Sequence, residues 1–257
     1  MAFLARESFD HAVGNSADLG SVSNHCSGCH LPMNSSLRGN KLSGYKIRLA
    51  DTDDYRSQAR LLINRMYEWR GYGNNHDIPM TASHLTFTAI DCCRTVGTVT
   101  LAIDSGKGIA ADGLFRNEIN AIRERDGARV CELTKLAFDA GAPSKPMLAA
   151  LFHIVFIYGY RQHYCTDLFI EVNPRHCRYY ETMLGFERIG EVKHHQGVAA
   201  PAQLMWLKVD EIRRRVEASK QPAGAQANRS LYNHFFSPKE EDGVFARLVS
   251  EREYPLH

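Results

Sequence analysis

The chain has 257 residues, enough for one hydrophobic core of about 180 to 200 residues with extensions. Hydrophobic residues make up 44% of it and charged residues 23%, and the formal net charge of +2 is too small to argue for nucleic-acid binding. No run of about 20 apolar residues exists, which excludes a transmembrane helix.

The first 44 residues are rich in Ser, Asn and Gly and show no sustained periodicity, so we expect a flexible leader over 1–44. Within it, the run CSGCH that begins at Cys26 matches the haem c attachment pattern, but attachment needs export and the N-terminus lacks the features of a secretory signal. We interpret the match as chance, with a zinc or redox role for Cys26 and Cys29 as the alternative. Seven scattered cysteines are typical of a reduced, cytoplasmic protein.

The first half of the folded part predicts a strand, a helix, a strand pair and a second helix. These elements are expected over residues 45–50, 53–69, 84–92 with 95–104, and 114–125. Asp51 or Thr52 is the expected N-cap of the first helix, and we expect Trp69 on its apolar face. The loop 70–83 is rich in Gly and Asn, so it is either a plain connection or a lid over a site.

The second half predicts a central strand, a long apolar helix, a strand–helix–strand unit, a last strand and a basic helix. These elements are expected over residues 129–138, 143–162, 168–172, 174–184, 186–192, 197–209 and 210–219. In the strand–helix–strand unit, Asn173 stands at an N-cap, Pro174 at the first helical position and Gly185 at a left-handed C-terminus. Ser144 is the expected N-cap of the long helix.

Residues 219–230 have the composition of a linker, and residues 231–257 predict an amphipathic helical tail. The tail contains a capping box from Ser237 to Glu240, followed by an apolar stripe that packs on its own domain or on a partner. The order of the elements predicts an α/β (α+β) fold, with a single twisted mixed sheet and helices on both faces.

The central strand RVCELTKLAF carries two charged side chains, Glu132 and Lys135. They are three residues apart and so lie on opposite faces of a regular strand, unless a bulge re-aims one of them. An acidic residue in such a strand is costly unless it is paired or employed. Glu132 is therefore either a general base or a member of a structural ion pair. Cys131 and Cys177 are interpreted as small buried hydrophobes rather than nucleophiles.

Five stretches of the chain resemble, in order, the N-acyl amino acid synthases, a branch of the GNAT acyltransferases related to acyl-homoserine-lactone synthases. They are YKIRLADTDDYRSQARLLINRMY, VGTVTLAID, RVCELTKLAF, DLFIEVNPRHCRYYETMLGFERIG and VAAPAQLMWLKV. The resemblance implies a GNAT-like domain over 45–218 that moves a long-chain acyl group from an acyl-carrier-protein thioester to the amine of an amino acid. It also implies that Glu132 is the base. The autoinducer synthases carry E-x-x-R, whereas Lys135 stands in the Arg position here and lacks its bidentate fork.

The turn after the central strand bears on the donor. Related acetyl-CoA enzymes cradle the pyrophosphate there with a glycine-rich turn, whereas residues 139–146 contain two prolines and one glycine. We therefore expect a carrier-bound phosphopantetheine thioester as donor substrate, with no further cofactor and no metal. Carrier proteins are acidic, and the basic residues expected to dock one are Lys145, Arg161, Arg175, Arg178 and Lys193.

The expected mechanism is direct attack on the thioester by an amine that Glu132 deprotonates. Backbone N–H groups near Leu133 and Thr134, where two strands splay, are expected to hold the oxyanion, and Tyr179 or Tyr180 to protonate the leaving thiolate. The expected substrate contacts are Leu133, Thr134, Lys135, Asn173, His176 and Arg70. Three alternatives stay open: a CoA-dependent N-acetyltransferase, an autoinducer synthase, and a non-enzymatic haem or metal sensor that uses CSGCH.

Overall fold

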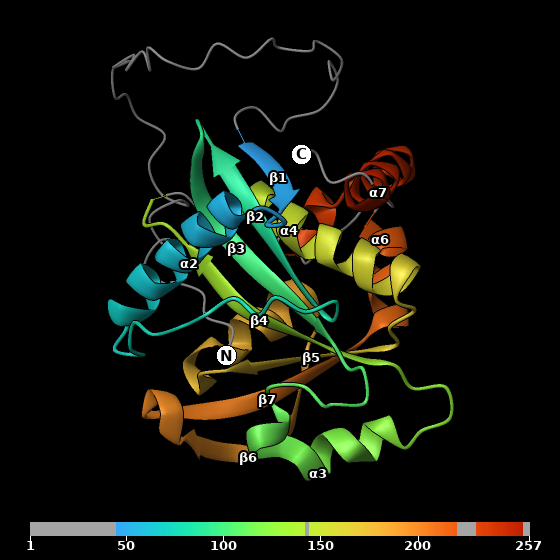
Figure 1. The fold of residues 1–257 in the computed structure, drawn as a ribbon. Coiled ribbons are helices and arrows are strands. Elements are labelled where there is room, and N and C mark those ends of the chain that lie inside the picture. The colour runs from blue at the N-terminus through green and yellow to red at the C-terminus, as the bar shows by residue number, and fades with distance from the viewer. Residues whose placement is uncertain (1–44, 142–143, 220–229, 254–257) are drawn as a thin grey trace, which may run out of the picture.

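The computed structural model describes residues 45–141, 144–219 and 230–253, so the leader with CSGCH and most of the linker lie outside it. The described chain forms one mixed seven-stranded sheet in the order β1-β2-β3-β4-β5-β7-β6 (Figure 1). The strands are β1 Tyr45–Leu49, β2 His84–Asp91, β3 Arg94–Ile103, β4 Val130–Phe138, β5 Asp167–Val172, β6 Glu187–His195 and β7 Ala200–Lys208.

Helices cover both faces of this sheet. They are α2 Asp53–Glu68, α3 Asp112–Arg123, α4 Lys145–Ile157, α5 Cys177–Leu184, α6 Val209–Ser219 and α7 Pro238–Glu253. Short turns are the π-helical η1 Tyr158–Gln162 and the 3₁₀ turns η2 Pro174–His176, η3 Gln196–Val198 and η5 Leu231–His234. None of the described helices combines the length and the apolarity needed to cross a membrane.

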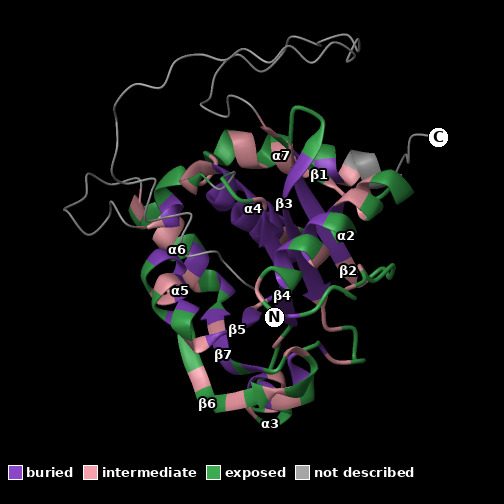
Figure 2. Cartoon of the chain, turned by 90° about the vertical axis from the view of Figure 1, so that its left-hand side faces the viewer, coloured by how far each residue is buried: buried purple, intermediate pink, exposed green. Residues whose placement is uncertain are grey.

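Alternate residues of the strands pack against different helices. In β4, Leu133 belongs to the large core under α4, while Val130 belongs to the smaller core under α3. Ala137, after the bulge described below, contacts the core under α2. Helix α4 is buried along its whole apolar length, and Figure 2 shows it as a continuous purple element behind the sheet. The expected architecture, a single twisted sheet covered on both faces, is confirmed.

Side-chain caps set several helix ends as the sequence predicts. Thr52, Ser144 and Asn173 each accept a hydrogen bond from a backbone N–H in the first turn that follows. Gly185 ends α5 with φ +76°, a conformation that favours glycine. The prediction for Trp69 is wrong: α2 ends one residue earlier, and the indole is 65% exposed.

Strands β4 and β5 separate partway along their length. Their parallel pairing runs from Val130 with Asp167 to Leu133 with Ile170 and then stops. Both strands continue beyond that pair, β4 to Phe138 and β5 to Val172. A gap therefore opens at the carboxyl ends of the two strands.

The partner on the other side, β3, meets a bulge in β4. Thr98 pairs with Ala137 and Thr100 with Thr134, so β4 holds one residue more than β3 over this stretch. Lys135 lies in the extra segment with φ +54°. A bulge of this kind bends the strand and re-aims a side chain.

The C-terminal helix α7 packs on the domain that precedes it. Leu248 is 1% exposed and belongs to the large core, with Val244 and Phe245 packed against it. The capping box forms: Ser237 N–H donates to Glu240 Oε2 over 2.8 Å, and Glu240 N–H donates to Ser237 Oγ over 3.4 Å. Arg161, just after α4, contacts Asp242 over 2.8 Å and lies over the ring of Phe245.

Candidate active site

Glu132 lies in β4 one residue before the β4–β5 pairing ends, and it is fully buried. The N–H of Ala111 donates a hydrogen bond to its Oε2 over 3.3 Å. Its Oε1 accepts no hydrogen bond from any described residue. The Oε2 oxygen is thus held by the Ala111 amide, while Oε1 is buried without a hydrogen bond from the described residues.

The loop before α3 keeps the Ala111 amide in place. Asp112 accepts a hydrogen bond from Ile109 N–H over 2.7 Å, and Arg123 bridges Asp112 and Asp104. Gly108 adopts φ +84°, where a Cβ would come within 2.5 Å of Asp112 Oδ2. The loop is therefore tightly bound to α3, which fixes the direction in which the Glu132 carboxylate points.

Burial raises the pKa of Glu132 to about 7, with a smaller contribution from the neighbouring Glu171 carboxylate. The Ala111 hydrogen bond opposes this rise without cancelling it. No Lys, Arg or His of the described residues forms a salt bridge with Glu132. Of the two interpretations of Glu132, the geometry supports a proton acceptor that changes state near neutral pH rather than an ion-pair member.

A row of buried threonines runs across the sheet beside Glu132. Thr86, Thr100 and Thr134 pair across β2, β3 and β4, and the hydroxyls of Thr86 and Thr100 are 2.8 Å apart. The next row contains His84, Ala102 and Glu132 on the same three strands. Of these three, the sequence reasoning named Thr134 but missed Thr86 and Thr100, although both alternate with apolar residues, in HLTFTAID and VGTVTLAID.

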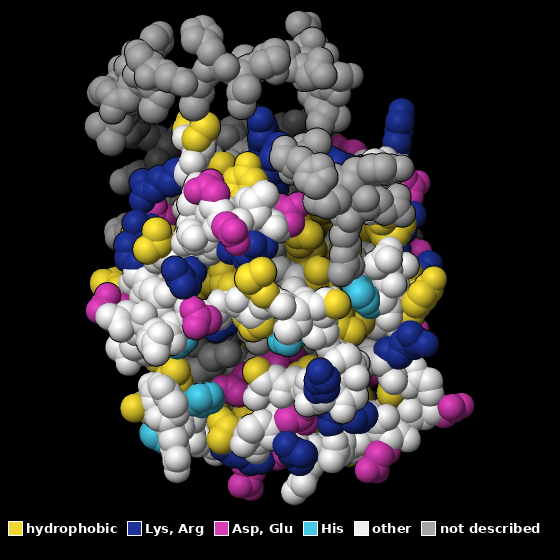
Figure 3. Space-filling model, in the orientation of Figure 1, with side chains coloured by type: hydrophobic (Ala, Val, Ile, Leu, Met, Phe, Trp, Pro, Cys, Tyr) yellow, Lys and Arg dark blue, Asp and Glu magenta, His cyan; other side chains and the backbone are white. Residues whose placement is uncertain are grey.

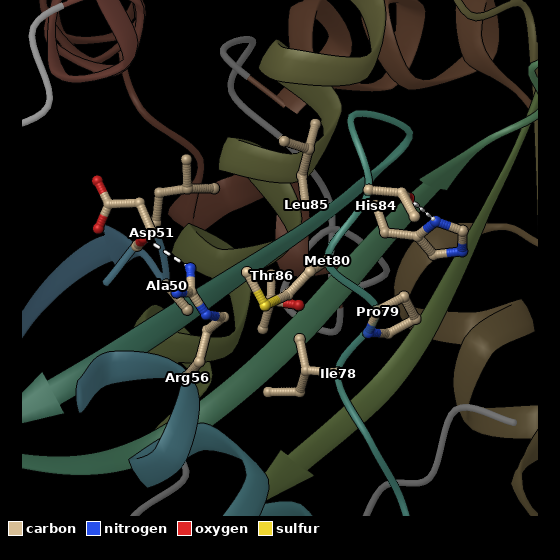
Figure 4. Close-up of a pocket in the computed structure, with 11 residues that line it drawn as sticks. Ala50, Asp51, Arg56, Ile78, Pro79, Met80, His84, Leu85 and Thr86 are labelled. Carbon is tan, nitrogen blue, oxygen red and sulfur yellow. Dashed lines mark hydrogen bonds between the residues drawn. The ribbon is translucent and has the colours of Figure 1, made fainter. Parts of the chain in front are cut away.

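A cavity of about 200 Å³ opens at the β2 end of these two rows. In Figure 4, Arg56 and Asp51 lie at one end, His84 lies at the other, and Thr86 lies between them. Ile78, Pro79 and Met80 from the loop 70–83 form the opposite wall. The position of these residues favours the interpretation of the loop 70–83 as a lid over the cavity rather than a plain connection.

The bulge places Lys135 near Glu132. The positive charge of Lys135 contributes, after burial, to lowering the pKa of His84 and of His76, and burial lowers the pKa of Lys135 itself. Glu132 acts on Lys135 in the opposite direction by attraction. At the bulge, Lys135 thus lies within electrostatic reach of Asp77 and Glu132, and of His76 and His84.

A second group of side chains lies where α2, the loop after it and α5 meet. Tyr180 is fully buried, burial raises its pKa, and Tyr67 and Arg70 act on its hydroxyl. That hydroxyl makes no hydrogen bond within the described part of the chain. Arg175 donates to the Tyr72 hydroxyl over 3.1 Å. Arg70 thus acts on the buried Tyr180 hydroxyl, while Arg175 is bound to Tyr72.

Tyr180 differs from its neighbour Tyr179, which is only partly buried and packs at the rim of the large core. The two rings meet edge to face at 5.6 Å. Of the two hydroxyls, that of Tyr180 is the one on which Arg70 acts. Burial also raises the pKa of the Cys177 thiol, and a hydrogen bond with Cys165 followed by burial raises that of Cys131, so both behave as buried hydrophobes.

Three other residues predicted to contact the substrate are buried or already hydrogen-bonded within the protein. The Leu133 side chain is buried in the large core, so only its backbone can face a substrate. Asn173 Oδ1 accepts a hydrogen bond from Arg175 N–H and acts as a cap. His176 is 4% exposed and receives a hydrogen bond from Arg175 Nε over 3.2 Å.

The five basic residues expected to dock a carrier do not form one patch. Lys145 begins α4 and Arg175 and Arg178 begin the α5 region, both at the carboxyl ends of β4 and β5. Arg161 lies past the other end of α4, about 20 Å along a 13-residue helix, and is paired with α7. Lys193 contacts Glu118 over 2.6 Å and the Leu114 carbonyl of α3. On the face in Figure 3, basic and acidic groups are interspersed.

Sequence reasoning also missed a second buried carboxylate, Glu171 of β5, which is 3% exposed. Its Oε1 lies 3.8 Å from Nε2 of His195, at the end of β6, and accepts no hydrogen bond from a described residue. The signal was present: Glu171 interrupts the apolar strand DLFIEV just as Glu132 interrupts RVCELTKLAF.

The comparisons with known proteins agree with this geometry. The family model described as N-acyl amino acid synthase FeeM matches residues 58–208. The structure of FeeM, an N-acyl amino acid synthase from uncultured soil microbes, is 30% identical, with a TM-score of 0.61 over 66% of this chain and 94% of that one. No curated protein matches.

Two further solved structures are more distantly similar. The AHL synthase LasI is 11% identical, with a TM-score of 0.49 over 64% of this chain and 90% of that one. An N-acetyltransferase from Staphylococcus aureus Mu50 is 11% identical, with a TM-score of 0.44 over 65% and 98% of the two chains.

Proposed function

Because the chain belongs to the N-acyl amino acid synthase family of GNAT-like acyltransferases, we propose that it transfers a long-chain acyl group from an acyl-carrier-protein thioester to the α-amine of an amino acid. The observation that carries the proposal is Glu132 itself. A buried carboxylate with a pKa of about 7 and one open oxygen lies beside the gap between β4 and β5. Such a group is suited to take a proton from an amine near neutral pH.

The reaction needs no covalent enzyme intermediate. Glu132 Oε1 takes a proton from the acceptor's ammonium group, and the free amine attacks the thioester carbonyl carbon. The C–N bond forms, the carbonyl oxygen becomes an oxyanion, and backbone N–H groups near Leu133 and Thr134 stabilise it where β5 no longer pairs with β4. The C–S bond then breaks: the Tyr180 hydroxyl gives its proton to the thiolate and takes in return the second proton of the attacking nitrogen, which leaves the amide, the thiol and a neutral tyrosine.

The acceptor lies on the threonine side of the sheet. Its amine reaches Glu132, and its carboxylate is attracted by Lys135. The cavity of about 200 Å³ under Ile78 to Met80 receives its side chain. This volume is below the roughly 300 to 1,000 Å³ of sites for larger ligands, which suits an amino acid better than an acyl chain.

The donor side supports a carrier protein rather than free CoA. The turn after β4 begins with Asp139, whose carboxylate is paired with Arg65 and Arg94, and its described glycine is Gly141. A turn whose described part holds one glycine is a poor cradle for a pyrophosphate, whereas carrier-bound phosphopantetheine brings only one phosphodiester. Lys145 and Arg178 lie at the same edge of the sheet and are placed to contact an acidic carrier. We also place the reaction in the cytoplasm, in keeping with the free cysteines of the described chain.

Mass spectrometry of lipids from cells that overexpress the protein tests this proposal. Cells with the wild-type chain should accumulate N-acyl amino acids, and cells with Glu132→Gln should not. The purified protein should then acylate one or more of the twenty standard L-amino acids with tetradecanoyl-acyl carrier protein. Tight binding of acetyl-CoA, together with inactivity towards the carrier-bound donor, would instead identify a CoA-dependent N-acetyltransferase.

A further inference from the structure

Glu171 lies at the point where the two central strands separate. The last β4–β5 pair is Leu133 with Ile170, so Glu171 and Thr134 are the next residues on the two strands. Phe169, two residues before Glu171, packs in the core under α3 and pairs with Glu132. Glu171 therefore shares the face of Glu132. A strand spacing of about 4.8 Å and two residues of rise put the two Cα atoms roughly 8 Å apart.

Neither buried carboxylate is paired with a Lys or Arg of the described residues, and the one basic side chain within ion-pair distance there is His195, beside Glu171. Glu132 is 0% and Glu171 3% exposed, and in each one oxygen accepts no hydrogen bond from a described residue. Two buried carboxylates this close repel each other and lose hydration, which is costly unless a cation or a shared proton compensates. The amine of the proposed acceptor is such a cation, because it arrives as an ammonium group.

The stoichiometry of the reaction adds a second requirement. An ammonium acceptor and a thioester give an amide, a thiol and one proton, so each turnover releases a proton that Glu132 has first received. Glu132 is sealed under the α3 loop and has no contact with solvent. A turnover cycle needs a route by which that proton leaves.

His195 lies on such a route. Its Nε2 is 3.8 Å from Glu171 Oε1, and its side chain is 34% exposed. An imidazole both accepts and donates protons near neutral pH. The sequence of groups from the buried base outward is therefore Glu132, Glu171, His195 and solvent.

We propose that Glu171 is a second functional carboxylate of this site, which holds the acceptor ammonium together with Glu132 and passes the released proton to solvent through His195. The proposal rests on the proposed function and goes beyond it by adding two residues and a direction of proton flow. The charged groups that face the pair are Lys135 on β4, His84 on β2 and His195 on β6, and α3 contributes the Ala111 N–H.

Glu171→Gln tests the carboxylate in an acyl-transfer assay with tetradecanoyl-acyl carrier protein and the best acceptor among the standard L-amino acids. The acceptor KM should rise about tenfold or more, because a charge-assisted hydrogen bond is lost. The acid limb of the kcat/KM profile should move to lower pH, because the repulsion that helps to raise the pKa of Glu132 is gone. An unchanged KM and an unmoved limb in a folded variant would overturn the role of Glu171.

His195→Asn tests the exit route, with the adjacent, exposed His194→Asn as the matched control. We expect kcat of the His195 variant to fall about tenfold or more and to be restored by added imidazole, whereas the control stays near wild type. A His195 variant that keeps the wild-type kcat in dilute buffer, or one whose kcat imidazole does not restore, would contradict proton exit through His195.

Failure of the proposed function looks different from failure of this inference. An inactive wild-type protein removes the function and, with it, the acceptor and its proton. If the wild-type protein is active and the Glu171 and His195 variants have its kinetic constants and pH profile, only this inference fails. Thermal melts across the pH range of the assays show whether each variant is folded before its kinetic constants are compared.

Discussion

The N–H of Ala111 donates its hydrogen bond to one oxygen of Glu132 and leaves the other oxygen open, because the turn before α3 ends directly above β4. One hydrogen bond thus orients the carboxylate and leaves its second oxygen without a hydrogen-bond donor among the described residues. A helix N-terminus normally favours the ionised form of a carboxylate, yet here burial outweighs it and the pKa rises to about 7.

Glu132→Gln should lower kcat by about 10² or more, the usual scale for a positioned proton acceptor. The same change should make the fold more stable at alkaline pH. The folded protein keeps a proton that the unfolded chain releases between the ordinary value of 4.5 and about 7, so ionising Glu132 lowers the free energy of unfolding as pH rises through that window. The loss is at most about 3 kcal/mol, and Gln avoids it.

Melting temperatures of wild type and Glu132→Gln at about pH 4 and about pH 8, which lie on either side of that interval, measure the effect. The variant should gain on the wild type as pH rises. A variant that is less stable at both pH values and still active would identify Glu132 as a structural residue instead.

Wild-type activity should have an acid limb near neutrality. Since the base must be ionised to take a proton, kcat/KM for the acceptor should rise as pH increases through about 7. The limb should be absent from the residual activity of Glu132→Gln. Steady-state rates from acid to alkaline pH supply the profile, and a flat wild-type profile would remove Glu132 from the base role.

Tyr180→Phe should lower kcat about tenfold or more with little change in either KM, because the variant keeps the buried ring and loses the proton donor. Tyr179→Phe is the matched control, since its ring lies beside Tyr180 but at the rim of the core. Equal losses in the two variants would argue that packing rather than proton donation is responsible.

Lys135→Met should raise the KM for the acceptor about tenfold and change kcat less, because it removes the charge near the acceptor carboxylate while preserving length. Lys135→Arg should retain more affinity than Lys135→Met. Initial rates at varied acceptor concentration and saturating donor separate the two parameters. A loss confined to kcat would place Lys135 with the reacting atoms instead.

Charge reversal of Lys145 and Arg178 should raise the KM for tetradecanoyl-acyl carrier protein several-fold and leave the acceptor KM unchanged, and added salt should act in the same direction. Arg116→Glu, an equal charge change on the exposed side of α3, is the control. Lys193→Glu should lower the melting temperature rather than change this KM, because Lys193 is already bound to Glu118. A salt-independent KM would exclude an electrostatic dock at this edge.

The sequence predicted what depends on local chemistry. Caps such as Thr52 and Asn173, the strand alternation and the left-handed Gly185 are short-range features, and the structure contains them. Glu132 was also recognisable, because a carboxylate in an apolar strand is unusual in itself. The family resemblance added the chemistry and the order of the elements.

What could not be predicted depends on register between distant strands. The threonine row forms only when β2, β3 and β4 are aligned, and Glu171 joins Glu132 only because β5 stops pairing at Ile170. The basic residues predicted to dock a carrier are spread over the fold: Lys145 begins α4, whereas Arg161 lies in η1, past the other end of that helix.

The extra residue in β4 has a consequence for transplanting this site into another protein. Copying Glu132 and Lys135 into a strand of regular geometry would turn them to opposite sides, one towards the acceptor and one into the core beneath. A designer would have to carry over the irregular backbone together with the two side chains. The spacing of Glu132 and Lys135 therefore brings the two side chains together only in a strand that also carries the bulge.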